Sequence, residues 1–577
     1  MKKLVSRFMA VLMAMTMILS MSMTAFAAEA PKGTLTVNNT VAEKTLDLYQ
    51  IFTATKSGEN VAYTLNSAYE GFFKTKVENG SSLSGEALSE AAYNYVKKHV
   101  GTNGDAETAK TFAKDVLGWI LDSKNNITAT KTVNTTATST VVPGLAYGYY
   151  LVYPKGATDT SAAPGKQDYT SVASLVSITA DTATINMKSN YPTVDKKIIP
   201  AQSGSGAKVD AIVNGSWENV SHMGLEDDEN ESEDTIAPRG AADGKKVEDF
   251  GIGDTVTYQL TSKVPDMTGY NSYTFKFSDT LSKGLDLKEV LSVKVGNTAL
   301  TAKNIGANTY ALAYDKNTRT LTVTLNDFYN SYKNRTGETI TVVYTATLNK
   351  DAVIGMNPNT NKAVVEYSNN PKSDETGKSE PSIVDVHTFD FTIYKYYLKD
   401  QNKTALASAE FELYKANAAG TAADENAKIN IVDEGNGVYR QATPGEASAS
   451  AKIVSDEDGK VLVKGLKAGT YYLRETKAPE GYNKLLRDIK VEIKANYDGT
   501  TGKLTSYSVD YTYNGNTTNG TAIKDKDNSP EVAVENKTGA QLPSTGSKGA
   551  LMVTLAGIVL FGALTASKAF GKKKAKN

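Results

Sequence analysis

Two stretches of the chain place a lysine among apolar residues at every second position: Phe389-x-Phe391-x-Ile393-x-Lys395 and Val194-x-Lys196-x-Ile198. Alternate residues of a β-strand share one face. We therefore expect Lys395 and Lys196, but not Lys197, to point into a core. Burial shifts a lysine toward its neutral amine, which is a nucleophile. The pattern predicts two lysines that could form a covalent bond inside the protein.

Other reactive groups are scarce, which excludes several classes of protein. The 577 residues contain no cysteine, so disulfides, thiolate metal sites and cysteine nucleophiles are excluded. The three histidines are far apart in sequence, and neither a metal site nor a cofactor is expected. Segments 1–27 and 546–577 hold nine basic residues and no acid, which leaves 54 basic against 64 acidic residues between them. This acidic body argues against nucleic-acid binding.

Both ends of the chain carry processing signals. A basic start, an apolar run and Ala25-Phe26-Ala27 predict a secretory signal peptide over residues 1–27. Near the other end, Leu542-Pro543-Ser544-Thr545-Gly546 precedes an uncharged apolar stretch over 549–567 and a basic tail. That stretch is just long enough to span a bilayer, with the basic residues held inside.

The tail over 542–577 resembles the sorting signal of Gram-positive surface proteins, which sortases cut between Thr and Gly. The resemblance implies that Leu542 and Pro543 belong to the recognition motif and that cleavage falls between Thr545 and Gly546. It also implies transient retention in the membrane and transfer of the Thr545 acyl group to an amine. The implied partners are a pilus-class sortase, a housekeeping sortase and peptidoglycan.

Strand and turn signals divide the rest of the chain into three domains. Abundant Tyr, Thr and Val favour a mostly β protein, and we expect tandem β-sandwich domains over 28–190, 191–385 and 386–541. Only the first domain has helical periodicity, with one helix capped by Ser84 and running to about His99, and a second capped by Asp105. A polar insertion over 202–249 contains an acidic run at 226–234, which we expect to be a solvated mobile loop rather than a cation site.

Besides the inward-facing lysine, the third domain contains two further segments that carry reactive groups: Tyr472-x-x-Glu475-Thr476-Lys477-Ala478-Pro479 and Val532-x-Val534-x-Asn536. This set resembles the collagen-binding-B-type, or pilin-type, immunoglobulin-like domain. In that family a strand lysine and a last-strand asparagine join spontaneously into an isopeptide bond, assisted by a buried acid. The resemblance implies a Lys395–Asn536 bond assisted by Glu475. A buried acid is shifted toward its protonated form, which can polarise the amide carbonyl and shuttle protons.

The middle domain contains a similar combination of lysine, acid and asparagine. Asn361 shares a strand face with Ala363, Val365 and Tyr367, and Phe277-Ser278-Asp279-Thr280-Leu281 resembles the Asp-containing strand of fimbrial middle domains. This resemblance implies a Lys196–Asn361 bond assisted by Asp279. Ordinary sandwiches, with a solvated lysine and a turn asparagine, remain the alternative in both domains.

The lysine that receives Thr545 of another subunit has two candidates. Val152-Tyr153-Pro154-Lys155 has the letters of the motif found in backbone pilins, and Lys188 has the expected position just before the middle domain. Force entering at Lys188 would reach Lys196 through a short segment and bypass the first domain. We therefore expect Lys188 to be the acceptor, with Lys155 as the alternative.

Together these features resemble a backbone (major) pilin of a sortase-assembled Gram-positive pilus. The resemblance implies a structural subunit rather than an enzyme, located in a fimbrium on the cell wall, with copies of itself and minor pilins as partners. The alternative is a wall-anchored adhesin, or a tip or basal pilin, that binds a host or matrix ligand. A backbone subunit predicts a ladder of heat-resistant multimers on a denaturing gel, and a singly attached adhesin predicts one band.

Overall fold

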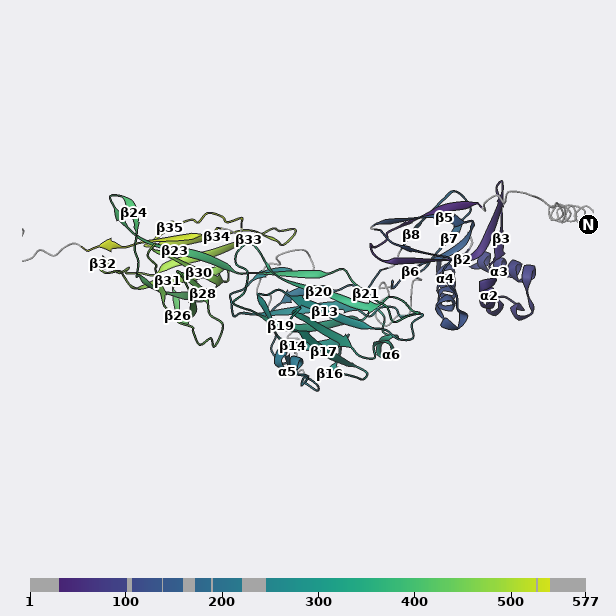
Figure 1. Cartoon of the computed structure of the whole chain (residues 1–577), viewed down its shortest axis with the longest axis horizontal. Coiled ribbons are helices and arrows are strands. Elements are labelled where there is room, and N and C mark those ends of the chain that lie inside the picture. Colours follow the sequence, from purple (N-terminus) through teal and green to yellow (C-terminus); the bar gives the residue numbers. More distant parts are fainter. Residues whose placement is uncertain are drawn as a thin grey trace, which may run out of the picture.

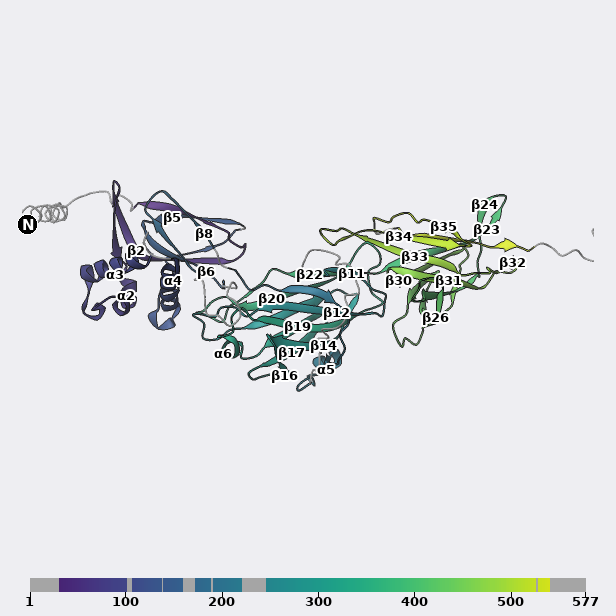
Figure 2. The same ribbon diagram turned by 180° about the vertical axis from the view of Figure 1, so that it is seen from behind.

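The structure is a computed structural model, and it describes residues 31–100, 106–136, 138–158, 172–187, 190–220, 245–525 and 528–539. Three β-rich bodies lie in a row along the long axis (Figures 1 and 2). The helices of the first body lie toward the N-terminal end, and the third body lies at the opposite end. The predicted mostly β fold, with helices added to the first domain, is confirmed.

Within its described residues, the first body has two sheets and three α-helices. The three-stranded sheet has the order β5-β1-β8, formed by β5 (Ser139–Ala146), β1 (Lys32–Asn38) and β8 (Thr182–Asn186). The five-stranded sheet has the order β3-β2-β6-β7, with β4 also paired to β2, and consists of β3 (Asn60–Leu65), β2 (Thr45–Ser57), β6 (Gly148–Lys155), β7 (Ser174–Ile178) and β4 (Lys131–Asn134). The α-helices are α2 (Glu70–Lys76), α3 (Gly85–Val100) and α4 (Ala106–Leu121).

The central sheet of this body is buried on both faces. Along β6, Tyr150 and Val152 pack toward the three-stranded sheet, and Leu151 and Tyr153 pack toward the helices. Alternate side chains of a strand point to opposite faces, so one run of apolar residues serves two cores. The predicted helices correspond to α3 and α4, whereas α2 was not predicted.

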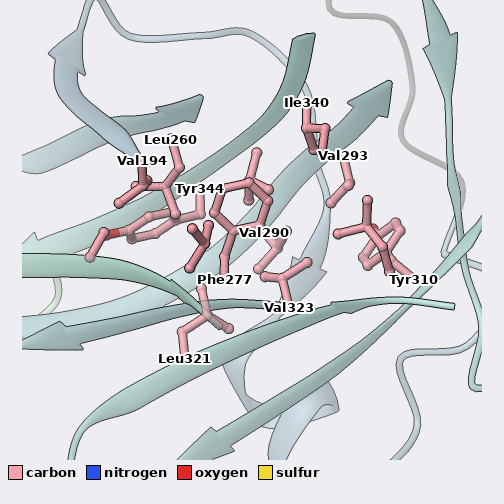
Figure 3. Close-up of a cluster of buried hydrophobic side chains, with 14 of the residues drawn as sticks. Val194, Leu260, Phe277, Val290, Val293, Tyr310, Leu321, Val323, Ile340 and Tyr344 are labelled. Atoms are coloured by element: carbon pink, nitrogen blue, oxygen red, sulfur yellow. The ribbon is translucent and has the colours of Figure 1, made fainter. Parts of the chain in front are cut away.

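The middle body is a two-sheet sandwich around one large core (Figure 3). The first sheet has the order β10-β14-β19-β12-β9, with β10 (Ala207–Lys208), β14 (Leu285–Val295), β19 (Thr339–Leu348), β12 (Thr255–Lys263), β9 (Asp195–Ile199), and β15 (Thr298–Ala299) on β14. The second has the order β11-β22-β20-β13-β18-β17-β16, with β11 (Val247–Asp249), β22 (Ser382–His387), β20 (Asn359–Ser368), β13 (Phe275–Leu281), β18 (Thr320–Leu325), β17 (Thr309–Asp315), β16 (Thr301–Ala302), and β21 (Thr376–Lys378) on β20. Short helices α5 (Val209–Asn214) and α6 (Phe328–Tyr332) flank it.

The third body is a second sandwich. One sheet has the order β24-β23-β30-β28-β27, with β24 (Asn402–Ala405), β23 (Phe389–Lys399), β30 (Lys460–Leu466), β28 (Val438–Gln441), β27 (Ile431–Gly435), and β36 (Glu531–Glu535) on β23. The other has the order β26-β25-β31-β33-β34-β35, with β26 (Ala423–Lys428), β25 (Glu410–Ala416), β31 (Gly469–Lys477), β33 (Ile489–Tyr497), β34 (Leu504–Tyr513), β35 (Asn516–Thr518), and β29 (Ile453–Val454) on β25. A small pair, β32 (Tyr482–Asn483) and β37 (Lys537–Thr538), lies at the outer end.

The start of the polar insertion over 202–249 folds onto the middle body, where Ala207, Ile212 and Trp217 are buried in the sandwich core. Apolar side chains spaced along a short strand and helix are enough to anchor this segment. The acidic run at 226–234 lies outside the described residues. Within the described ranges no helix is long and apolar enough to cross a membrane, and the span predicted at 549–567 lies outside those ranges.

The junctions between the bodies contain direct contacts. Only buried Thr388 separates β22 of the middle body from β23 of the third. Asp249 accepts hydrogen bonds from the Ala468 amide (3.0 Å) and the Tyr497 hydroxyl (2.9 Å) of the third body. At the other junction, the Asp266 amide donates to the Thr158 hydroxyl at 2.6 Å. Such short, hydrogen-bonded connections restrain neighbouring domains.

Candidate functional site

Opposite sheets of the middle sandwich bring Lys196, Asp279 and Asn361 together. Lys196 lies on β9, where it pairs with Leu260 of β12. Asp279 on β13 and Asn361 on β20 lie diagonally across one strand pair. All three side chains are at most 1% exposed, whereas the neighbouring Lys197 is about one-third exposed.

The groups of this cluster meet around a tyrosine hydroxyl. Lys196 Nζ forms an ion pair and a short hydrogen bond with Asp279 and donates to the Tyr344 hydroxyl at 2.6 Å. Tyr344 donates to Asp279 Oδ1 at 2.9 Å, and Asn361 Nδ2 donates to the Tyr344 oxygen at 2.7 Å. Asn361 Oδ1 is buried and, among the described residues, has no hydrogen-bond partner.

Burial moves both ionisable groups of the cluster toward their neutral forms. Desolvation lowers the pKa of Lys196 from 10.5 to about 8, although the adjacent Asp279 opposes this shift. Desolvation also raises the pKa of Asp279, against the effects of Lys196 and of the Tyr344 hydrogen bond. A neutral amine can attack a carbonyl carbon, and a protonated carboxyl can give a proton to the carbonyl oxygen. The arrangement therefore holds a nucleophile, an acid and an amide in one dry site.

A second buried asparagine on the same face of β20 has no comparable role. Asn359 Oδ1 accepts from the Val353 amide at 2.8 Å, and its Nδ2 donates to the Val353 and Val386 carbonyls. Asn359 is thus held by backbone groups. Among the described residues the Asn361 carbonyl oxygen has no hydrogen-bond partner, which is rare for a buried polar atom and calls for an explanation. An amide carbonyl that is placed for attack by the Lys196 amine would explain why this oxygen lacks a partner.

The third sandwich brings Lys395, Glu475 and Asn536 together in the same way. Lys395 lies on β23, Glu475 lies on β31 of the facing sheet, and Asn536 directly follows β36. All three are at most 2% exposed. The chain passes close by at Gly459, where a Cβ atom would come within 2.3 Å of the Lys395 carbonyl oxygen and φ is +68°. Only glycine fits at that turn.

The contacts of this second cluster place the acid between the other two groups. Lys395 Nζ lies 3.0 Å from Glu475 Oε1, although the atoms are not aligned for a hydrogen bond. Asn536 Nδ2 donates to Glu475 Oε2 at 3.2 Å and to the Asn483 carbonyl at 2.8 Å. Asn536 Oδ1 is buried and lacks a partner among the described residues, as Asn361 Oδ1 does.

The amine of Lys395 is also shifted toward its neutral form. Burial lowers its pKa from 10.5 to about 8, and the nearby Glu475 carboxylate opposes the shift. The Leu485 amide holds Glu475 Oε2 at 2.7 Å, which fixes the orientation of the carboxyl group. Both clusters thus share buried amine, acid and amide groups, with an unpartnered amide oxygen.

The two clusters differ in what a bond would connect. Lys196 and Asn361 come from opposite sheets, so their bond would tie the middle sandwich across its core. β23 and β36 are parallel neighbours in one sheet, with Lys395 opposite Val534. A Lys395–Asn536 bond would join β23, the first strand of the third body, to the end of β36.

The candidate acceptors fall in different parts of the chain. Lys155 is the last residue of β6, is about one-quarter exposed and lies 3.6 Å from Asp47. The next residue, Gly156, packs against Asn369 of the middle body, so Lys155 lies at the junction of the first two bodies. Lys188, Leu542, Pro543, Thr545 and Gly546 lie outside the described residues.

Tyr344 is the contact that the sequence analysis missed. Ile340, Val342, Tyr344 and Ala346 share the buried face of β19, so period-two spacing alone indicates that Tyr344 points inward. It does not indicate that a hydroxyl would meet Lys196 and Asn361. Within the described ranges, no cluster of three or more His, Cys, Asp or Glu residues could hold a metal ion.

Two parts of the chain match known protein families. Residues 252–371 match a family described as Gram-positive pilin backbone subunit 2, Cna-B-like domain. Residues 390–507 match a family described as SpaA, prealbumin-like fold domain. Each match contains the acid of one cluster, Asp279 in the first and Glu475 in the second.

Individual proteins are also similar to this chain, one in sequence and others in structure. The chain is 25% identical over 327 residues to the trypsin-resistant surface T6 protein of Streptococcus pyogenes serotype M6, over 51% of this chain and 50% of that protein. It thus spans about half the length of this curated relative. Similar solved structures include the T6 backbone pilin of S. pyogenes, with a TM-score of 0.43 and 17% identity over 89% of this chain and 100% of that one. The major pilin SpaA of Corynebacterium diphtheriae gives a TM-score of 0.40 and 13% identity over 87% and 99%.

Proposed function

We propose that this homologue of Gram-positive backbone pilins is the repeating subunit of a covalently polymerised surface pilus, stabilised by two internal isopeptide bonds. One observation carries the proposal. Each of the two pilin-type domains holds a buried lysine and acid as an ion pair, with a buried asparagine hydrogen-bonded to the acid or to the tyrosine beside it. Unpaired buried charges are costly, and such groups persist in a core only when they are paired or react.

The bond requires no cofactor. The neutral lysine Nζ attacks the asparagine Cγ, the Cγ–Nδ2 bond breaks, and Nδ2 leaves as ammonia with the proton that Nζ loses. The acid lends a proton to the amide oxygen during attack and is unchanged at the end. Holding the amine and the amide in contact supplies up to about 7–11 kcal/mol of the barrier. The protein acts once on itself and does not turn over.

Intact-mass spectrometry of residues 28–541 tests both bonds. Each bond removes one ammonia, so the mass is expected to fall about 34 Da below the sequence mass, about 17 Da per bond. An unshifted mass would refute both bonds. Tryptic peptides that join the strand of Lys196 to that of Asn361, and Lys395 to Asn536, would locate them.

Polymerisation makes the chain a sortase substrate. A sortase would join Thr545 to a lysine of the next subunit, and a housekeeping sortase would finally link the fibre to peptidoglycan. Of the two acceptors, the position before the middle domain supports Lys188, while the structural surroundings support Lys155. Lys155 lies at the same junction, is partly exposed, and has Asp47 beside it as a proton acceptor. Lys155→Ala and Lys188→Ala variants decide between them by loss of the multimer ladder.

A further inference from the structure

The hydroxyl of Tyr344 is the meeting point of the middle-domain cluster. A phenol can donate one hydrogen bond and accept two. Tyr344 uses this full capacity, because it donates to Asp279 and accepts from Lys196 and Asn361. The side chain is fully buried beside Val194 and Leu260 (Figure 3), so these contacts are shielded from bulk solvent.

In the third domain no tyrosine lies between the acid and the amide of the described cluster. There the acid contacts the amide directly, because Asn536 Nδ2 donates to Glu475 Oε2. In the middle domain no hydrogen bond joins Asp279 to Asn361 within the described part of the chain. Tyr344 lies between them and contacts both, at 2.9 Å and 2.7 Å. The Tyr344 hydroxyl thus bridges the distance between the amide and the aspartate, whose side chain is shorter than that of glutamate.

We infer that Tyr344 is a further catalytic residue for the Lys196–Asn361 bond, acting as a proton relay between Asp279 and the departing amide nitrogen. This inference rests on the proposed isopeptide chemistry. By binding Nζ and Nδ2 on one oxygen, Tyr344 also holds the amine next to the amide.

The relay balances without any further reactant. As Nζ bonds to Asn361 Cγ, the nitrogen gives a proton to Asp279. The attack withdraws Nζ from the Tyr344 oxygen, and the Tyr344 hydroxyl turns from Asp279 to Nδ2. The Asp279 carboxyl then gives its own proton to the Tyr344 oxygen, and Tyr344 gives its proton to Nδ2, which leaves as ammonia. Asp279 and Tyr344 end in the protonation states in which they began. The only bonds exchanged between heavy atoms are Cγ–Nδ2, which breaks, and Cγ–Nζ, which forms.

Tyr344→Phe tests this relay by removing a single oxygen atom. Tyr332→Phe is the matched control, because Tyr332 is equally buried in the same core and its hydroxyl has no hydrogen-bond partner among the described residues. Bond formation would be followed by intact-mass and peptide spectrometry at successive times after a pulse of expression. We expect the middle-domain bond to form about 10²- to 10⁴-fold more slowly in Tyr344→Phe and normally in Tyr332→Phe.

The chain contains an internal control for this experiment. The Lys395–Asn536 bond lies in another domain and is expected to form at the same rate in every variant. Asn361→Ala, which cannot form the middle bond, gives the melting temperature of a folded but unreacted middle domain. If Tyr344→Phe melts well below that reference, 4-aminophenylalanine at position 344, which places a hydrogen-bonding group where the hydroxyl was, is compared with 4-methylphenylalanine, which does not, for faster bond formation.

Failure of the relay differs from failure of the proposed bonds. If the unmodified chain loses no ammonia in the middle domain, the proposed bond itself is wrong. If the unmodified chain loses both ammonia molecules and Tyr344→Phe does so equally fast, only the role of Tyr344 is refuted. Equal slowing by Tyr332→Phe, or bond formation no faster with 4-aminophenylalanine than with 4-methylphenylalanine, would also overturn it.

Discussion

Replacing Glu475 by glutamine should block the third-domain bond while keeping the shape of the site. The carboxyl contacts Lys395 Nζ at 3.0 Å, the Leu485 amide at 2.7 Å and Asn536 Nδ2 at 3.2 Å. Glutamine has the same volume and can still accept from Leu485. It cannot cycle a proton between the amine and the amide. The variant should therefore fold with Lys395 and Asn536 unreacted.

The structure gives the size of the stability loss. The Lys395–Asn536 bond closes a loop of about 140 residues, and a cross-link of that span removes unfolded-state entropy equivalent to about 5 kcal/mol at 25 °C. For a domain of this size, roughly 2–4 °C of melting temperature correspond to 1 kcal/mol, so the third domain should melt about 10–20 °C lower.

Calorimetry and intact-mass spectrometry on the same sample test this prediction. The variant should lose one ammonia instead of two, and only the transition of the third domain should move. Glu480→Gln is the control, because Glu480 is an exposed acid of the same segment and the charge change is identical. Loss of both ammonia molecules in Glu475→Gln would refute the role of the acid. Loss of one ammonia with an unchanged melting temperature would refute the entropy argument.

Three further predictions follow from the same geometry. Asp279→Asn should prevent the middle bond alone, leaving a mass deficit of one ammonia that peptide mapping assigns to the third domain. In Asn536→Ala, which leaves Lys395 unreacted, the pKa of about 8 in the folded state lies below 10.5, so the unfolded state binds more protons between these values. The free energy of unfolding of that domain should therefore rise as pH increases from about 8 to 10.5, measured by calorimetry at successive pH values; a fall would contradict the assignment of a desolvated amine. In cells that carry the pilus sortase, Lys155→Ala should abolish the multimer ladder if Lys155 is the acceptor, and a ladder lost only in Lys188→Ala would assign the link to Lys188.

The sequence was sufficient where local periodicity decides the structure. Period-two spacing predicts that Lys196 of β9 points into the core and that Lys197 points away from it. In the structure Lys196 is buried and Lys197 is not. The helices α3 and α4 follow from their apolar stripes. These features depend on neighbours within one element, so one segment of sequence is enough to predict them.

The sequence was insufficient where packing between distant elements decides the structure. Tyr344 meets Asn361 only because two sheets face each other in one register, and no local pattern encodes that distance. Helix α2 is short, and its buried Phe72 and Phe73 give no repeating stripe. Trp217 lies in a polar stretch and is buried because the middle sandwich offers an apolar surface there. In each case tertiary contacts outweigh local preference.

The placement of the two predicted bonds also affects resistance to proteases. Once formed, each bond connects a strand near the start of its domain to one near the end, so most surface loops of both sandwiches lie within closed covalent rings. A peptide bond cut between Lys196 and Asn361, or between Lys395 and Asn536, would open a ring without separating the chain into two pieces. A fibre built from such subunits could accumulate many cuts in these loops and still keep its length, and only cuts in the short connections between rings would shorten it.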